Sequence, residues 1–182
     1  MKTSLIILAA LLWGAGLARA GEATLGICLG IPAIDPGTER DVVAFDRTSH
    51  FPVILTNNSD KPQRIITDWN SWGEQTLSFE LTDKAGKTSV AHRVAVDYTK
   101  NTPHWWILQP RESMVLDVYF ADPYRWTGFP DPAHYGDSET VTLRAVFEYH
   151  LAQEKLRTNG EWTGRVTSEP EQVVFCNRVP EK

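Results

Sequence analysis

The chain has 182 residues, a formal net charge of −5 at pH 7 and only two cysteines. The acidic balance argues against nucleic acid and anionic membranes as partners. Two cysteines alone make neither a metal site nor a redox motif, and the length suits one domain with decorated loops.

The first 20 residues have the pattern of an export signal. Lys2 precedes the apolar run Leu5–Leu17, and Ala18-Arg19-Ala20 fits the small-x-small cleavage rule. The run is too short to span a membrane comfortably, and we expect no other span. Cleavage would leave one domain over 21–182, with 16 basic against 23 acidic residues and a net charge of −7. We therefore expect an exported protein, periplasmic or extracellular.

The rest of the chain is divided into short apolar or alternating segments bounded by clusters of Gly, Pro, Asn and Asp. Such segments are typical of strands separated by turns. The pattern predicts strands over 25–31, 42–46, 51–56, 63–67, 77–82, 88–96, 114–120, 140–150, 162–168 and 172–176, with a further short apolar stretch over 105–108.

Two segments carry the strongest alternation. Residues 77–82 place Leu, Phe and Leu on one side, and Asp83–Lys87 then reads as a hairpin turn. Residues 140–150 alternate with only Val146 out of pattern. Apart from a possible single helical turn over 153–156, no helical period is found in the mature chain. The pattern predicts an all-β fold, an antiparallel β-sandwich of the immunoglobulin-like kind.

Six tryptophans follow the signal, which is many for one sandwich. The polar and Gly or Pro neighbours of Trp69, Trp72 and Trp126 place these three in loops or at strand ends. Exposed loop aromatics are platforms for sugar rings or for a protein partner. Packing at the ends of the sandwich is the commoner role of such residues, and it is the competing interpretation.

Cys28 and Cys176 lie near opposite ends of the mature chain. In an exported protein, a disulfide between them would tie the first strand to the last. Two unpaired thiols are the alternative.

The sequence contains no pattern that points to catalysis or to a bound cofactor. The five histidines lack the spacing of a zinc site, and no nucleophile elbow or phosphate loop is present. The loop 121–138 and the adjacent Glu139 carry the carboxylates Asp122, Asp131, Asp137 and Glu139, but their spacing matches no calcium loop. We expect no metal and no cofactor.

Residues 51–62 read as a strand and turn, and 143–149 with 162–168 as closing strands. These segments resemble an early strand and turn and the closing strands of exported bacterial immunoglobulin-like proteins of unassigned function. Residues 108–113 resemble their proline-glycine-glutamate turn, with Arg111 where glycine is usual. The Trp69–Gly73 segment, Trp-Asn-Ser-Trp-Gly, is shared with the same group. The resemblance implies a fold and carries over no catalytic residue. The Asn-Asn-Ser turn alone gives a more distant likeness to bacterial proteinase-inhibitor domains.

These observations favour a non-catalytic binding or structural module that contacts a protein or a cell-surface glycan through Trp69, Trp72 and Trp126. Two alternatives stay open. One is an envelope-polymer hydrolase that uses the carboxylates of the 121–139 loop, and the other is a proteinase inhibitor.

Overall fold

The protein is described by a computed structural model that covers residues 24–31, 41–44, 50–99, 102–120, 126–134, 136–150 and 160–176. All regular structure in these residues is β, with no helix, and therefore none that could cross a membrane. The expected all-β fold is confirmed. The helical turn expected over 153–156 lies outside the described residues.

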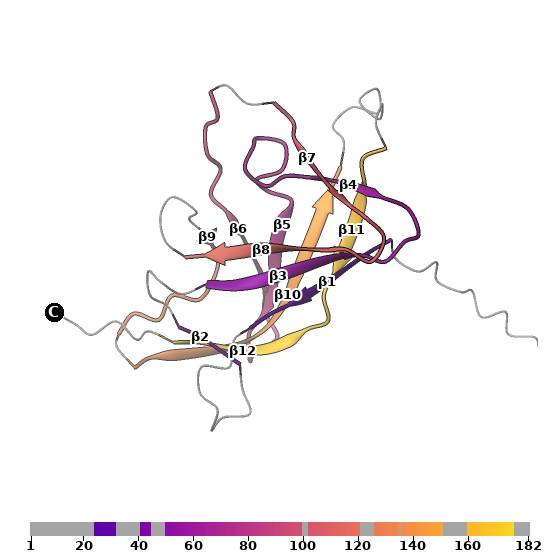
Figure 1. The fold of residues 1–182 in the computed structure, drawn as a ribbon. Coiled ribbons are helices and arrows are strands. Elements are labelled where there is room, and N and C mark those ends of the chain that lie inside the picture. The colour runs from indigo at the N-terminus through magenta and orange to yellow at the C-terminus, as the bar shows by residue number, and fades with distance from the viewer. Residues whose placement is uncertain are drawn as a thin grey trace, which may run out of the picture.

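The described residues form twelve strands in three sheets (Figure 1). The first sheet has the order β1-β3-β8, from β1 (Leu25–Leu29), β3 (His50–Asn57) and β8 (Ser113–Tyr119). A two-stranded ribbon pairs β4 (Gln63–Ile66) with β7 (Trp105–Leu108).

The largest sheet has seven strands in the order β2-β12-β10-β5-β6-β9, with β11 also on β10. Its members are β2 (Asp41–Ala44), β5 (Leu77–Thr82), β6 (Thr88–Arg93), β9 (Trp126–Thr127), β10 (Ser138–Tyr149), β11 (Gly164–Thr167) and β12 (Glu171–Cys176). Among the described residues, every strand pairing in the three sheets is antiparallel except that of β2 with β12.

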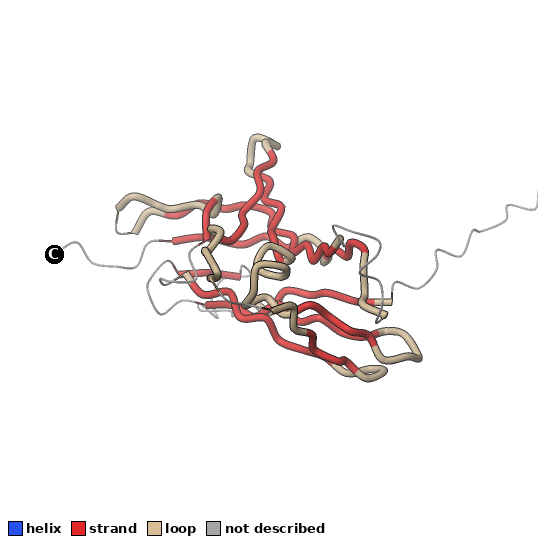
Figure 2. The backbone as a smooth tube through the Cα atoms, turned by 90° about the horizontal axis from the view of Figure 1, so that it is seen from above, coloured by secondary structure: helices blue, strands red, loops and turns tan. Residues whose placement is uncertain are grey.

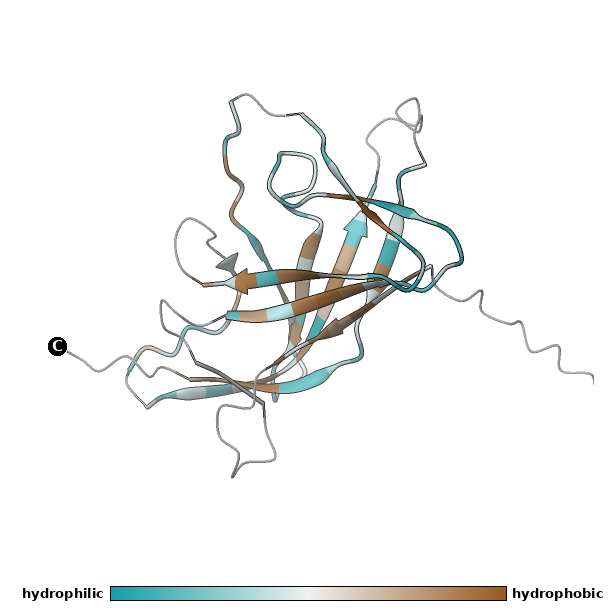
Figure 3. Cartoon of the chain, in the orientation of Figure 1, coloured by the Kyte–Doolittle hydropathy of each residue, from teal (hydrophilic) through white to brown (hydrophobic). Residues whose placement is uncertain are grey.

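The three-stranded and seven-stranded sheets form two layers with the apolar core between them (Figure 2). Alternate residues of each strand supply the core, as a period of two requires. The fully buried phenylalanines are Phe51 on β3, Phe79 on β5, Phe147 on β10 and Phe175 on β12. Hydrophobic residues accordingly follow the strands of both layers (Figure 3). The arrangement is that of an antiparallel β-sandwich.

The turn before β8 holds a residue in a left-handed conformation. Arg111 has φ 66°, the one positive φ of a non-glycine residue in the described chain. Its N–H donates to the Asn57 carbonyl at 2.9 Å, and Glu112 Oε2 accepts the Gln109 N–H at 2.7 Å. Glycine adopts this conformation without steric cost, so Arg111 occupies a position that favours glycine.

The expected disulfide between Cys28 and Cys176 is absent from the structure. Cys28 lies on β1 of the three-stranded sheet, exposed on the side away from the buried Leu25 and Leu29. Cys176 ends β12 in the opposite layer. A disulfide needs the two Cβ atoms about 4 Å apart, and a Cys28 side chain turned away from the core does not face the other sheet.

An ion network covers the outer face of the seven-stranded sheet. Arg165 on β11 donates to Glu148 at 2.6 Å and to Glu80 at 2.5 Å, and a His150 ring nitrogen lies 2.6 Å from the other Glu148 oxygen. Since β10 lies between β11 and β5, the guanidinium must cross β10 to reach Glu80. Val146, the residue that breaks the alternation of β10, is buried and lies between Arg144 and Glu148, the register partners of Glu80 and Arg165.

Because this network contains an ionised carboxylate, we expect the free energy of unfolding to depend on pH. The hydrogen bond from His150, followed by the contacts of Arg165, lowers the pKa of Glu148 below 4.5 against an opposing effect of burial. The ionised carboxylate therefore stabilises the fold above pH 4.5, and this contribution is lost as the pH falls through the lowered pKa. We expect Glu148→Gln to be less stable than wild type at pH 7, with the gap closing under acid. Urea unfolding at pH 7, 4.5 and 3 measures both proteins, and a gap independent of pH would contradict the assignment.

Candidate functional site

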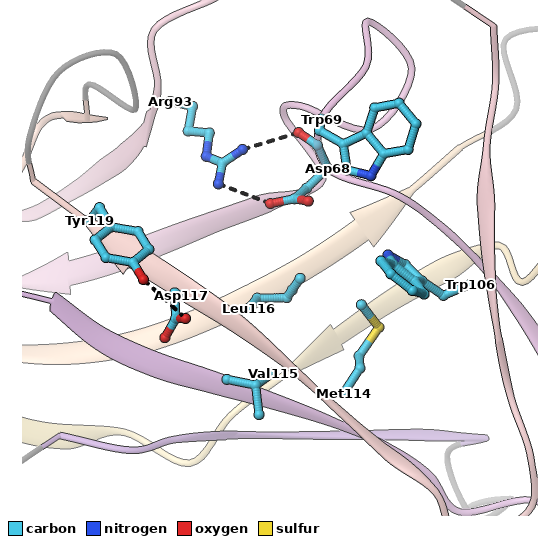
Figure 4. A pocket seen from close by; sticks show the side chains of 9 residues that line it. All are labelled: Asp68, Trp69, Arg93, Trp106, Met114, Val115, Leu116, Asp117 and Tyr119. Atoms are coloured by element: carbon cyan, nitrogen blue, oxygen red, sulfur yellow. Dashed lines mark hydrogen bonds and ion pairs between the residues drawn. The ribbon is translucent and has the colours of Figure 1, made fainter.

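A groove of about 640 Å³ lies beside β8 (Figure 4). This volume lies within the range of about 300–1,000 Å³ that is common for ligand sites. One side is formed by β8, and the opposite wall comes from the loop after β4, the end of β6 and the ribbon strand β7. The lining residues are Asp68, Trp69, Arg93, Trp106, Met114, Val115, Leu116, Asp117 and Tyr119.

A buried asparagine holds the loop after β4 in the conformation that exposes Trp69. Asn70 is fully buried and donates to the Thr67 side chain at 2.7 Å, while its side-chain oxygen accepts the backbone N–H groups of Trp72 and Gly73. A Cβ on Gly73 would come within 1.8 Å of the Thr67 carbonyl oxygen. Asn70 and Gly73 therefore close the loop, and Trp69 is held outward with 49% of its surface exposed.

A partly buried ion pair forms the upper wall of the groove in Figure 4. Arg93 donates to the Asp68 carboxylate at 2.9 Å and to the Asp68 carbonyl at 3.0 Å. The guanidinium also lies 5.7 Å from the ring centroid of Trp126, within the usual distance of a cation–π contact. Trp126 itself packs on Phe79 with ring centroids 5.2 Å apart. The core thus fixes the position of Arg93.

The ribbon strand β7 contributes the second exposed tryptophan. Trp106 pairs with Ile65 across the ribbon and is 49% exposed, whereas the neighbouring Trp105 is turned the other way and stacks under the Arg64 guanidinium at 5.0 Å. Trp69 and Trp106 therefore reach the groove from separate elements. Two large aromatic surfaces at one groove are suited to a ligand with apolar parts.

Asp117 carries the net negative charge of the groove. The Asp68 carboxylate is neutralised by Arg93, but Asp117 makes no ion pair within the described chain. It accepts a hydrogen bond of 3.3 Å from the Tyr119 hydroxyl and is exposed. A cationic group on a ligand would be complementary to it.

The three tryptophans expected as a binding surface have different positions. Trp69 lines the groove, whereas Trp72 is 43% exposed but lies outside it. Trp126 is half-buried in β9 and affects the groove only through Arg93. Trp106, Asp117 and Tyr119 line the groove as well. The sequence around each residue does not indicate the groove, because its lining comes from the loop after β4, β6, β7 and β8 together.

The carboxylates considered for hydrolysis lie elsewhere. Asp131, Asp137 and Glu139 are exposed, Asp137 accepts the backbone N–H of His134, and Asp122 lies outside the described residues. Among the residues that are described, no group of three or more His, Cys, Asp or Glu side chains gathers as a metal site would require. We find no specific observation that favours hydrolysis.

No protein-family model matches the chain, and a search of curated proteins finds no significant match.

Proposed function

We propose that this chain is an exported, non-catalytic binding module that holds a partner protein in the groove beside β8. The observation that carries the proposal is the pair of half-exposed tryptophans, Trp69 and Trp106, which line one cavity together with the Arg93–Asp68 ion pair. Aromatic anchors in a pocket supply most of the binding energy of typical protein interfaces.

The strand order supports an immunoglobulin-like connectivity for this module. In constant-type immunoglobulin domains, the first, second and fifth strands share one sheet, and the third, sixth and seventh share the other. The comparison treats β4, β7, β9 and β11 as additions to the fold and β2 as a continuation of β1. The orders β1-β3-β8 and β12-β10-β5 then match those of the two immunoglobulin sheets. Such domains commonly serve recognition, although a fold by itself assigns no function.

The proposal predicts that the loss of a tryptophan in the groove and the loss of one outside it have different effects on binding. We expect Trp106→Ala to weaken binding by about 2 kcal/mol, roughly 30-fold in Kd, as for a central interface aromatic. Trp72→Ala is the matched control, because Trp72 is similarly exposed but outside the groove. It should change the Kd less than about twofold.

The measurement begins with labelled protein on an array of peptides and an array of cell-surface oligosaccharides. Each hit is then titrated in solution by tryptophan fluorescence against wild type and both variants. Peptide binding that depends on Trp106 supports the proposal. Binding to oligosaccharides alone would replace the protein partner with a glycan, and equal losses for Trp72→Ala and Trp106→Ala would remove the groove as the site.

A further inference from the structure

The groove follows the edge of β8 and not one of its faces. Successive residues of a strand point to opposite sides of the sheet. Met114 and Leu116 point toward the core, Val115 and Asp117 point outward, and all four line the groove. A cavity lined from both sides of a strand must run along that strand's edge.

The hydrogen bonds around β3 show which backbone groups face this edge. The Pro52 carbonyl accepts from Gly30 on the β1 side at 2.8 Å. Asn57, an odd number of residues away, exchanges bonds with Glu112 and Arg111 on the β8 side, both at 2.9 Å. Because backbone direction alternates along a strand, the residues of β3 that bond to β8 are 51, 53 and 55.

The partners of those three residues in β8 are Val118, Leu116 and Met114. The backbone N–H and C=O groups of Val115 and Asp117 therefore point away from β3 and toward the groove. Neither residue has a backbone partner on that side in the described chain, where β8 is the last strand of its sheet. An open, largely apolar edge of seven residues lacks the usual protections against strand pairing, except for one outward carboxylate.

We infer that the partner enters the groove as an extended segment and pairs with β8 as a fourth strand of the sheet. The inference rests on the proposed function, since it specifies how the partner protein is held. Backbone hydrogen bonds to Val115 and Asp117 supply affinity, and the groove selects side chains on alternate positions. In constant-type immunoglobulin domains, the sheet that corresponds to β1-β3-β8 has a fourth strand beside the counterpart of β8.

The lining residues define the sequence that fits. Side chains of the added strand that point inward meet Met114, Leu116 and Trp106, so these positions are apolar. The residue opposite Asp117 points outward with it and is Lys or Arg. Directly opposed unlike charges stabilise a strand pair.

A second copy of the chain fits the edge less well. Residues 113–119 contain no Lys or Arg, so pairing β8 with β8 would leave Asp117 without a cation. Both copies would also carry the same negative net charge. A basic, otherwise apolar segment of another protein is the complementary occupant.

The probe is a seven-residue acetylated and amidated peptide, Leu-Thr-Leu-Lys-Leu-Thr-Leu, titrated into the purified protein and followed by tryptophan fluorescence. We expect saturable binding that weakens roughly tenfold when Lys is replaced by Glu, and a reversed preference for the Asp117→Lys protein. N-methylation removes the N–H of a peptide amide. Methylating the alternate amides that face β8 should weaken binding roughly tenfold, whereas methylating those that face away should have little effect. Equal effects of both sets would overturn strand addition.

Val115→Pro tests the protein side of the same bonds. Proline removes an N–H that the β8–β3 ladder does not use, and edge strands tolerate it there. We expect it to weaken the peptide roughly tenfold, whereas Val115→Thr, which keeps the N–H, leaves the Kd within about threefold. Hydrogen exchange of wild type gives a measure that needs no variant, because the Val115 and Asp117 amides should become protected when the peptide binds.

The two proposals fail in different ways. Peptide binding that requires Trp106 but leaves the Val115 amide unprotected would overturn strand addition and keep the groove as a protein-binding site. Binding insensitive to both Trp69→Ala and Trp106→Ala would overturn the proposed function itself. If neither the probe nor any array peptide binds, but an array oligosaccharide binds in a Trp106-dependent way, strand addition and the protein partner are both overturned.

Discussion

Replacing Phe79 by alanine is expected to lower the free energy of unfolding by about 3–5 kcal/mol, as is usual for a buried phenylalanine. Phe79 is fully buried on β5, and its ring contacts Phe51, Trp126 and Phe129 with centroids 5.1–5.5 Å apart. Alanine removes these contacts and leaves a cavity between the two sheets. The surrounding rings belong to separate strands and loops, so they cannot all close the space.

Urea unfolding followed by tryptophan fluorescence measures this loss. Val90→Ala is the control, because Val90 lies on the adjoining strand β6 with 53% of its surface exposed and should change stability by about 0.5 kcal/mol or less. A loss below about 1 kcal/mol for Phe79→Ala would mean that the aromatic cluster is not the centre of the core. Because Trp126 supports Arg93, we also expect this variant to weaken binding in the groove.

The second large effect is expected for Asn57→Ala, at about 3 kcal/mol, from several polar groups that lose their partner together. Asn57 is fully buried at the end of β3. Its amide donates to the carbonyls of Leu108 and Lys61 at 3.0 and 2.8 Å, and its oxygen accepts from the backbone and hydroxyl of Ser59. The Leu108 carbonyl ends β7 and would be left buried without this donor.

Asn58→Ala is the matched control for this variant, since Asn58 is the next residue and its side chain makes none of these bonds. We expect it to cost less than about 1 kcal/mol. Thermal unfolding compares the two, and equal losses would show that the turn and not the Asn57 side chain carries the stability. The Asn57 side chain bonds to the end of β7, the strand that carries Trp106. We therefore expect Asn57→Ala to weaken ligand binding even at temperatures where the variant is still folded.

The sequence by itself determined most of the strands. Alternating apolar residues mark β5, β8 and β10, because a half-buried strand needs a side-chain period of two, and a short apolar run marks β3. The structure places these strands within two residues of the predicted boundaries. The turn over 83–87 was equally clear, since Asp83 and Gly86 form it through local bonds alone. Local patterns report local geometry, and these elements depend on little else.

The tertiary structure alone decided which residues meet at the groove. Apolar and polar side chains would alternate along β8 in the same way at the centre or at the edge of a sheet. The local sequence therefore does not indicate that this edge is open. Likewise Trp69, Trp72 and Trp126 have similar polar neighbours, yet one lines the groove, one lies outside it and one packs beneath Arg93. The disulfide expected from two distant cysteines does not form, although the alternation of Leu25, Ile27 and Leu29 already placed Cys28 on the face away from the core. Contacts between residues far apart in the chain are set by packing between the sheets, and that packing is what makes the site.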